Sequence, residues 1–191
     1  DIDLLELDAQ IIEGDNQEYL ELKNFIENND LSDETNYEYV KSQIDIDNFV
    51  LYNAAQIYID NRDWPGNNIK YWRPQSNEGK WRWILYDTDF GFGVPWMGLG
   101  YNVNTLQFAV EENGPDWPNP PWSTFLFRKL LENPNYQQRF INIFCDMFNT
   151  IFISDYMINK LDLMAANIEN IIPIHQGKWP ESAIDWDYHI Q

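Results

Sequence analysis

Apolar side chains recur at steps of three and four residues through the first part of the chain, which is the spacing of one helix face. They cluster in residues 19–26 and again in residues 37–44, and Ser32 stands where a cap for the second segment is expected. This pattern predicts that residues 1–44 form a helical lead-in.

A stronger helix is predicted immediately afterwards. Its apolar face is formed by Ile46, Phe49, Val50, Ala54, Ile57 and Tyr58. Ser42 and Asp45 offer a capping-box start. The helix is expected to end near Asp60, because Trp64-Pro65-Gly66 cannot continue it. Residues 61–68 are therefore expected to form an irregular loop held by a rigid helix, which is a common setting for catalytic groups.

Two short strands are predicted at residues 69–73 and 80–86, joined by a turn-rich segment. In the second strand the large apolar side chains occupy alternate positions: Trp81, Trp83 and Leu85. A hairpin brings its two open ends together in space. The loop before the first strand and residues 87–91 after the second are therefore expected to be neighbours.

The rest of the chain is predicted to be a long loop followed by helices. Residues 94–121 are rich in Gly, Pro, Asn and Trp and have no sustained period, which indicates a long ordered loop or a segment that orders on binding. Helices follow over residues 122–172 and stop at Pro173, leaving residues 173–191 as a tail. We therefore expect one mainly α (α+β) domain whose central part is residues 45–93.

Composition narrows the classes of function. The 191 residues are 44% apolar and form a globular chain, although 12 basic residues against 31 acidic ones give a net charge of −19. This charge disfavours nucleic acid and anionic membranes as partners, and favours basic polypeptides or multivalent cations. No apolar run approaches the length that spans a membrane. Cys145 is the single cysteine, so an intrachain disulfide is excluded, and its apolar surroundings predict a buried thiol.

Candidate chemistry lies on the two neighbouring loops. Asp63 is followed five residues later by Asn68, and the second predicted strand leads into Asp89-Phe90-Gly91. Protein kinases place their catalytic base and metal ligands in this order. Phosphoryl transfer needs one carboxylate beside the acceptor hydroxyl, and further oxygen ligands for the metal ions on the phosphates. Asp87 competes with Asp89 as a metal ligand, because spacing alone does not choose between them.

Each short motif has a plainer explanation. Residues 63–68 contain the Asp, Pro, Gly and Asn that a turn after a helix requires. Asp87 and Asp89 would share one solvent face of a plain hairpin, or would bind calcium. Taken singly, each motif favours the plain explanation, whereas the two together in kinase order favour the chemistry.

Several longer blocks resemble the spore coat protein H (CotH) kinase family. The resemblance is dense over residues 42–93 and continues to about residue 172. The blocks that carry it are Asp45-Ile46-Asp47-Asn48-Phe49, Asp60-Asn61-Arg62-Asp63-Trp64-Pro65-Gly66-Asn67-Asn68, Tyr71-Trp72-Arg73 and Lys80-Trp81-Arg82-Trp83-Ile84-Leu85-Tyr86-Asp87-Thr88-Asp89-Phe90-Gly91.

The resemblance implies a kinase-like large lobe, a helical bundle in which a small β-hairpin carries the catalytic and metal-binding loops. It implies that Asp63 is the catalytic aspartate and that Asn68 and Asp89, or Asp87, bind Mg²⁺ or Mn²⁺. It also implies phosphate transfer from ATP to serine on secreted or coat proteins, and hence a location outside the cell or on a spore coat. Asn61 stands where many kinases have histidine. In this resemblance residues 94–121 correspond to a loop like the activation segment of kinases.

The lead-in departs from a complete kinase. Nothing before residue 45 is predicted to form a small lobe with a phosphate-binding strand lysine, because Lys23 and Lys41 both fall in predicted helices. We expect a large-lobe fragment that binds nucleotide weakly and turns over little. The acidic surface suits a basic, Ser- and Lys-rich protein substrate, and the sequence leaves the oligomeric state open.

Two functions from other classes remain possible at this point. One is an extracellular calcium- or carbohydrate-binding module whose sugar-stacking platform is formed by Trp64, Trp72, Trp96, Trp117 and Trp122. The other is a glycoside hydrolase that uses two carboxylates such as Asp63 and Asp89.

Overall fold

A computed structural model describes residues 1–93, 103–112 and 118–180. The sequence predicts a single domain, and the packing of the chain separates two compact units, Asp1–Phe144 and Cys145–Gln191. The first unit combines helices with one small antiparallel sheet, so the expectation of a mainly α (α+β) fold is confirmed.

The sheet has four strands in the order β2-β1-β3-β4. These are β1 (Ile2–Glu6), β2 (Gln10–Glu13), β3 (Lys70–Pro74) and β4 (Arg82–Ile84). The hairpin of β3 and β4 was predicted, but the prediction that the lead-in is helical from its first residue is wrong. β1 alternates between partly and fully buried positions and β2 is an exposed edge strand, so neither shows a helix face.

The hairpin of β1 and β2 is followed by α1 (Gln17–Asn28), α2 (Glu34–Gln43) and α3 (Ile46–Tyr58). Of these helices, α3 leads into the candidate site. Asp33 and Asp45 cap α2 and α3 through their side chains. The predicted serine caps are therefore wrong. The Ser32 backbone N–H donates to Asp30, and Ser42 lies inside α2, where its hydroxyl donates to the Tyr39 carbonyl.

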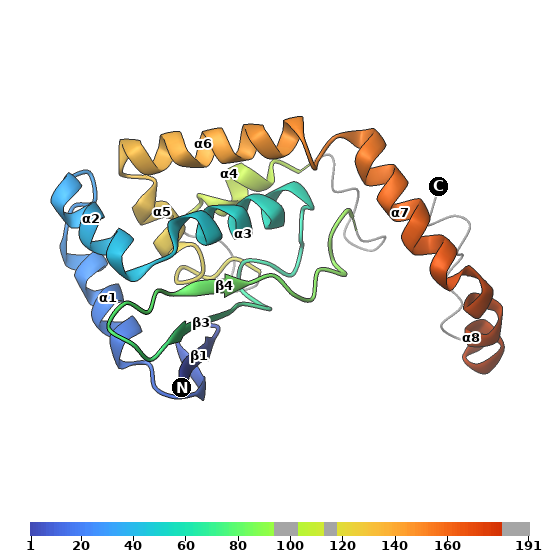
Figure 1. Ribbon diagram of the computed structural model, residues 1–191, viewed down its shortest axis with the longest axis horizontal. Helices are drawn as coiled ribbons and strands as arrows, with labels where there is room; N and C mark the ends of the chain where they lie inside the picture. The colour runs from blue at the N-terminus through green and yellow to red at the C-terminus, as the bar shows by residue number, and fades with distance from the viewer. Residues whose placement is uncertain (94–102, 113–117, 181–191) are drawn as a thin grey trace. The chain divides into compact units, whose positions relative to one another are not determined.

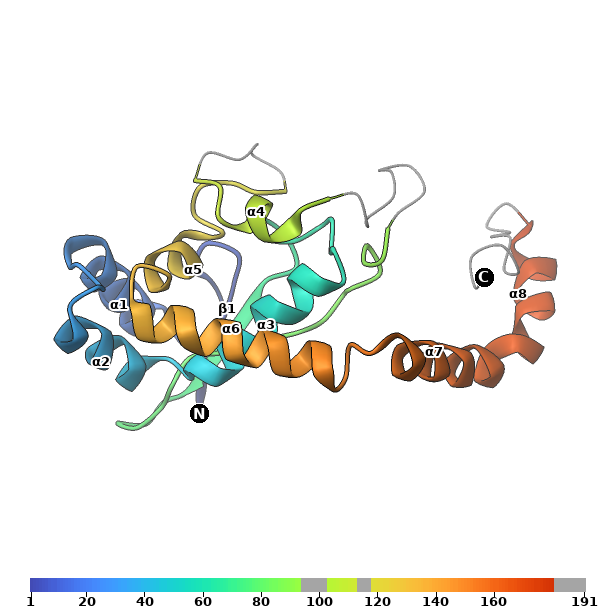
Figure 2. The same cartoon turned by 90° about the horizontal axis from the view of Figure 1, so that it is seen from above.

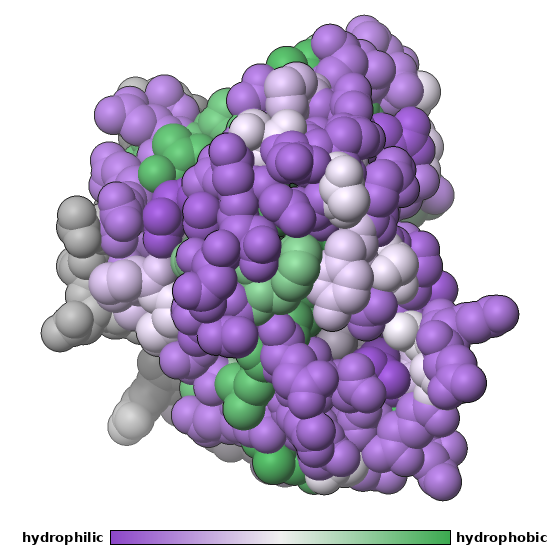
Figure 3. Space-filling model, turned by 90° about the vertical axis from the view of Figure 1, so that its left-hand side faces the viewer, coloured by the Kyte–Doolittle hydropathy of each residue, from purple (hydrophilic) through white to green (hydrophobic). Residues whose placement is uncertain are grey.

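The face of the molecule that α1 and α2 dominate is mostly hydrophilic (Figure 3).

The core of the first unit includes an aromatic cluster between the sheet and α3. Tyr71 stacks on Trp83 at 5.4 Å between ring centroids, and Phe49 of α3 meets Trp83 at 4.5 Å. Figure 1 shows α3 between the sheet and α6 (Pro134–Asn149). The helix that leads into the candidate site is thus packed on two sides, which fixes the point where the site loop begins.

The ion pair between Arg139 of α6 and Asp47 of α3 predicts a small pH dependence. Both contacts are 2.8 Å, and hydrogen bonding to Arg139 lowers the pKa of the Asp47 carboxyl. A lowered pKa contributes stability above the ordinary carboxyl range and loses it as the pH falls through the lowered value. Arg139→Gln is expected to cost less than about 1 kcal/mol near pH 7, because the pair is exposed, and less as the pH falls through the lowered pKa of Asp47. Urea unfolding at neutral and at acidic pH measures the cost, and a pH-independent cost would contradict the prediction.

Among the described residues the first unit also contains the short helices α4 (Thr105–Ala109) and α5 (Phe125–Leu130). α4 lies in a segment predicted to have no regular structure, so that prediction is corrected for residues 105–109. Figures 1 and 2 both show α4 beside the C-terminal end of α3. The buried Thr105 and Ala109 face inward from α4.

The second unit contains α7 (Ser154–Ile168), the 3₁₀-helix η2 (Glu169–Ile171) and α8 (Ile172–Lys178). Pro173 does not stop the helical run as predicted. It lies in the first turn of α8, where the missing N–H removes no intrahelical hydrogen bond.

Cys145 is exposed, so the prediction of a buried thiol is wrong. None of the described helices is long and apolar enough to cross a lipid bilayer.

Candidate functional site

The first site loop begins where α3 ends. Asn61 is 2% exposed and bridges the helix to the loop. Its Nδ2 donates to Gln56 Oε1 of α3 at 2.9 Å, and its Oδ1 accepts the Asp63 backbone N–H at 3.2 Å. The residue that stands in the histidine position of many kinases is therefore a buried amide that aligns the Asp63 backbone with the helix.

The Asp63 carboxylate is held by two neighbouring amides. Its Oδ2 accepts from Asn68 Nδ2 at 2.6 Å and from Asn67 Nδ2 at 2.8 Å. Asn68 has a φ of 52°, a conformation that asparagine tolerates better than most residues. The loop therefore brings Asp63 and Asn68 into direct contact. Their hydrogen bond also fits a plain turn, so this contact alone does not choose between the two explanations.

The second site loop carries the other two candidates, Asp87 and Asp89, just after β4. Both are exposed, and Asp87 has a φ of 51°. A side-chain hydrogen bond with Asp89 raises the pKa of the Asp87 carboxyl, and the negative charges of Asp89 and Asp63 raise it further. The two loops meet at this end of the hairpin, where the Arg62 backbone of the first loop bonds to the Phe90 backbone of the second.

Two backbone hydrogen bonds tie the loops together. The Arg62 N–H donates to the Phe90 carbonyl at 3.0 Å, and the Phe92 N–H donates to the Ile59 carbonyl at 2.5 Å. Gly91 lies between these bonds, and a Cβ there would come within 3.0 Å of the Thr88 carbonyl oxygen and 3.3 Å of the Ile59 side chain. Close contacts within its own loop and with the end of α3 therefore leave little room for a side chain at this position.

Two further residues at this end of the hairpin were not identified from the sequence. Lys70 Nζ lies 4.8 Å from the centroid of the Tyr86 ring. Desolvation raises the pKa of the Tyr86 hydroxyl, and the charges of Glu6, Asp87 and Asp63 raise it further. The Lys70 ammonium group and the Tyr86 ring therefore lie together at the end of the hairpin from which the two acidic loops leave. The sequence places both in the predicted strands but does not distinguish them from other exposed strand residues.

The donor set fits a hard divalent cation in its chemistry. Carboxylate and amide oxygens, which Asp63, Asn68, Asp87 and Asp89 carry, are the ligands that Mg²⁺ and Mn²⁺ take in proteins. The charges of Asp89 and Asp63, which add to the rise in the pKa of the Asp87 carboxyl, would be offset by a bound cation. Within the described ranges, however, no three His, Cys, Asp or Glu side chains are gathered closely enough to hold a metal ion.

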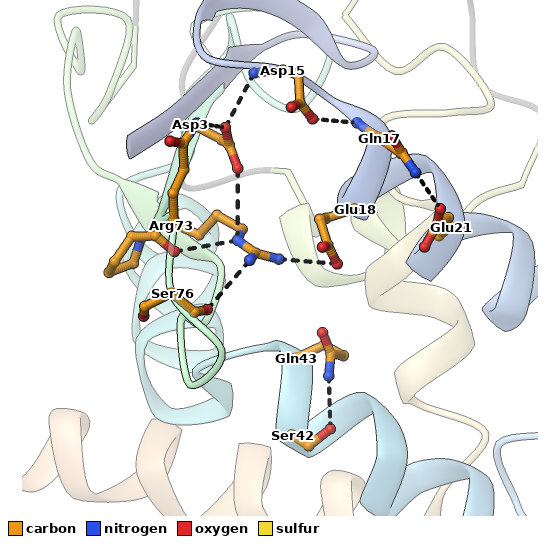
Figure 4. Close-up of polar contacts among 11 residues, drawn as sticks. Asp3, Asp15, Gln17, Glu18, Glu21, Ser42, Gln43, Arg73 and Ser76 are labelled. Carbon is orange, nitrogen blue, oxygen red and sulfur yellow. Dashed lines mark hydrogen bonds and ion pairs between the residues drawn. The ribbon is translucent and has the colours of Figure 1, made fainter. Parts of the chain in front are cut away.

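A second polar cluster lies at the opposite end of β3 (Figure 4). The buried Arg73 guanidinium pairs with Glu18 at 3.3 Å and with Asp3 at 3.7 Å. Asp3 also accepts from the Asp15 backbone N–H and from Gln75 Nε2. These residues border a polar cavity of about 610 Å³. This cluster was not predicted from the sequence, because Asp3 meets Arg73 only through the unpredicted pairing of β1 with β3.

The proposed sugar-stacking platform is not supported. Trp64 is only 2% exposed and cannot stack on a ligand. Trp72 and Trp122 are half-buried, and Trp96 and Trp117 lie outside the described residues.

Comparison with known proteins gives one match. A family model described as CotH kinase protein matches residues 6–191, nearly the whole chain. No curated protein and no solved structure matches the sequence.

Proposed function

Because the chain belongs to the CotH kinase family, we propose that it is the large lobe of a protein kinase that transfers phosphate from ATP to serine. The observation that supports this most is the meeting of two loops at one end of the hairpin. One loop carries the Asp63–Asn68 pair, the other carries the Asp87–Asp89 pair, and the Arg62–Phe90 hydrogen bond joins them.

In this proposal Asp63 orients the acceptor hydroxyl and accepts its proton. The amides of Asn67 and Asn68 fix the direction of the carboxylate, which general-base catalysis requires. Asn68 and Asp89, or Asp87, hold Mg²⁺ or Mn²⁺ through oxygen atoms. When bound, such an ion neutralises charge on the nucleotide phosphates.

The substrate and the location are part of the same proposal. A chain with a net charge of −19 attracts a basic polypeptide, so a Ser- and Lys-rich protein is the proposed acceptor. The family resemblance supports action outside the cell or on a spore coat.

Nucleotide binding by this lobe is proposed to be weak. Lys23 and Lys41 lie on helices α1 and α2 and pair with Asp8 and Glu38. Neither therefore takes the part of the strand lysine that holds the α- and β-phosphates in kinases.

Asp89→Asn is expected to weaken Mn²⁺ binding by about tenfold or more, because it removes a charged oxygen ligand. Asp87→Asn is expected to have the smaller effect, since Asp89 occupies the Asp-Phe-Gly position. Calorimetric titration of the chain with Mn²⁺ measures both affinities. The control is Asp155→Asn, an exposed change on α7. Unchanged affinity in both site variants would rule out the metal assignment.

The whole function is tested by incorporation of labelled phosphate from ATP into a basic, Ser-rich protein. The assay uses the longest native chain that contains residues 1–191. We expect incorporation that depends on a divalent metal. Binding of a glycan without metal-dependent phosphate transfer would instead support a carbohydrate-binding module.

A further inference from the structure

Asp60 is a buried carboxylate at the start of the first site loop, and the chemistry above does not use it. It is 6% exposed and has a φ of 48°. It follows Ile59, the C-cap of α3, so it lies between the rigid helix and the loop that carries Asp63. Burial of a carboxylate is unfavourable unless partners compensate it, which makes its contacts informative.

The main partner of Asp60 comes from another segment of the chain. Thr105 Oγ1, in the first turn of α4, donates to Asp60 Oδ1 at 2.7 Å. Arg62 Nη1 contacts the same oxygen at 3.4 Å. Asp60 Oδ2 is buried and has no hydrogen-bond partner within the described part of the chain. The carboxylate is thus held on one side by α4 and on the other by the loop it begins.

Asp60 lies within the short segment whose backbone forms the two hydrogen bonds between the loops. The Ile59 carbonyl and the Arg62 N–H, which form those bonds with Phe92 and Phe90, lie on either side of it in sequence. A shift of Asp60 therefore moves both bonds together. The same bonds set how close Asp63 lies to Asp87 and Asp89.

We propose that Asp60 is a positioning residue: through its hydrogen bond with Thr105 it anchors residues 59–62 to α4 and so holds the two acidic loops at their working separation. The effect on metal binding rests on the proposed function. The effect on loop anchoring does not, because it concerns backbone hydrogen bonds alone. Asp60 touches neither substrate nor metal in this proposal and acts only through its neighbours.

Three variants test the anchor. Thr105→Val removes the hydroxyl and keeps the shape, whereas Thr105→Ser keeps the hydroxyl. Asp60→Gly removes the carboxylate, and glycine accepts the positive φ without strain. The matched control is Asp3→Ala, which removes a carboxylate that is 3% exposed in the Arg73 cluster at the far end of β3 (Figure 4).

Two readouts are measured on the full chain. Hydrogen exchange of the Arg62 and Phe92 amides, relative to the core amide of Val50, reports on the bonds between the loops. Calorimetric titration with Mn²⁺ alone reports on the separation of the carboxylates. We expect Thr105→Val and Asp60→Gly to speed relative exchange at both amides about tenfold and to weaken Mn²⁺ binding by about ten- to a hundredfold.

Thr105→Ser is expected to match the native chain in both readouts, and Asp3→Ala is expected to change neither relative exchange nor Mn²⁺ affinity. Native exchange in Thr105→Val would overturn the proposal, as would an equal effect of Asp3→Ala. If Asp60→Gly does not fold, the two Thr105 variants decide the outcome. If the native chain binds no Mn²⁺, the metal part of the proposed function fails, and the exchange rates still decide whether Asp60 anchors the loops.

Discussion

Replacing Asp63 by alanine is expected to reduce phosphate transfer by about 10²- to 10⁴-fold, the contribution of a positioned general base. The fold is expected to survive, because Asp63 is only half-buried and its partners Asn67 and Asn68 are also partly accessible to water. Phosphate incorporation into a basic, Ser-rich protein gives the ratio, measured in parallel for the longest native chain that contains residues 1–191 and for its Asp63→Ala variant.

Asp155→Ala is the matched control for this variant, since it removes an exposed carboxylate from α7. Asp63→Asn refines the result, because it keeps the shape and removes the charge and the basicity. Transfer by Asp63→Ala within about twofold of the native rate would exclude the mechanism.

Trp81→Ala is expected to lower the free energy of unfolding by about 3–5 kcal/mol, as large-to-small changes of buried aromatic residues do. Trp81 is 1% exposed and packs edge-on against Tyr19 at 5.3 Å and Tyr71 at 5.7 Å. Urea unfolding measures the change. Trp72→Ala, a half-buried tryptophan on the neighbouring strand, is the control and should cost less. A loss below about 1 kcal/mol at position 81 would show that the aromatic cluster does not carry the stability of the sheet.

The parts of the fold that were predicted correctly are those determined by local pattern. α3 was predicted from its apolar face and its end from the residues that follow it, and the β3–β4 hairpin from alternation around a turn-rich segment. β1 was missed because its stability comes from a partner distant in sequence, with Leu5 opposite Tyr71 in the sheet. A five-residue strand carries too little periodicity of its own to reveal that pairing.

The candidate site likewise combines features that the local sequence predicts with features that depend on residues distant in sequence. The hairpin predicted that the two loops would meet, and the Arg62–Phe90 backbone hydrogen bond joins them. The roles of Asp63, Asn68, Asp87 and Asp89 at that meeting point stay predictions. The contact of Asp60 with Thr105 could not be predicted, because nothing in either local sequence indicates the other. Cys145 was predicted to be buried from its apolar neighbours, but pattern alone does not tell which side of a helix is covered.

Broadening of resonances by Mn²⁺, measured by NMR on the isotopically labelled chain, tests the central claim most directly because it locates the ion. At low Mn²⁺ the signals of Asn68, Asp87 and Asp89 are expected to broaden first, with Asp63 among them. Broadening confined to the acidic residues around Arg73, or spread evenly over the acidic surface, would contradict the claim that the two loops form a metal-binding phosphoryl-transfer site.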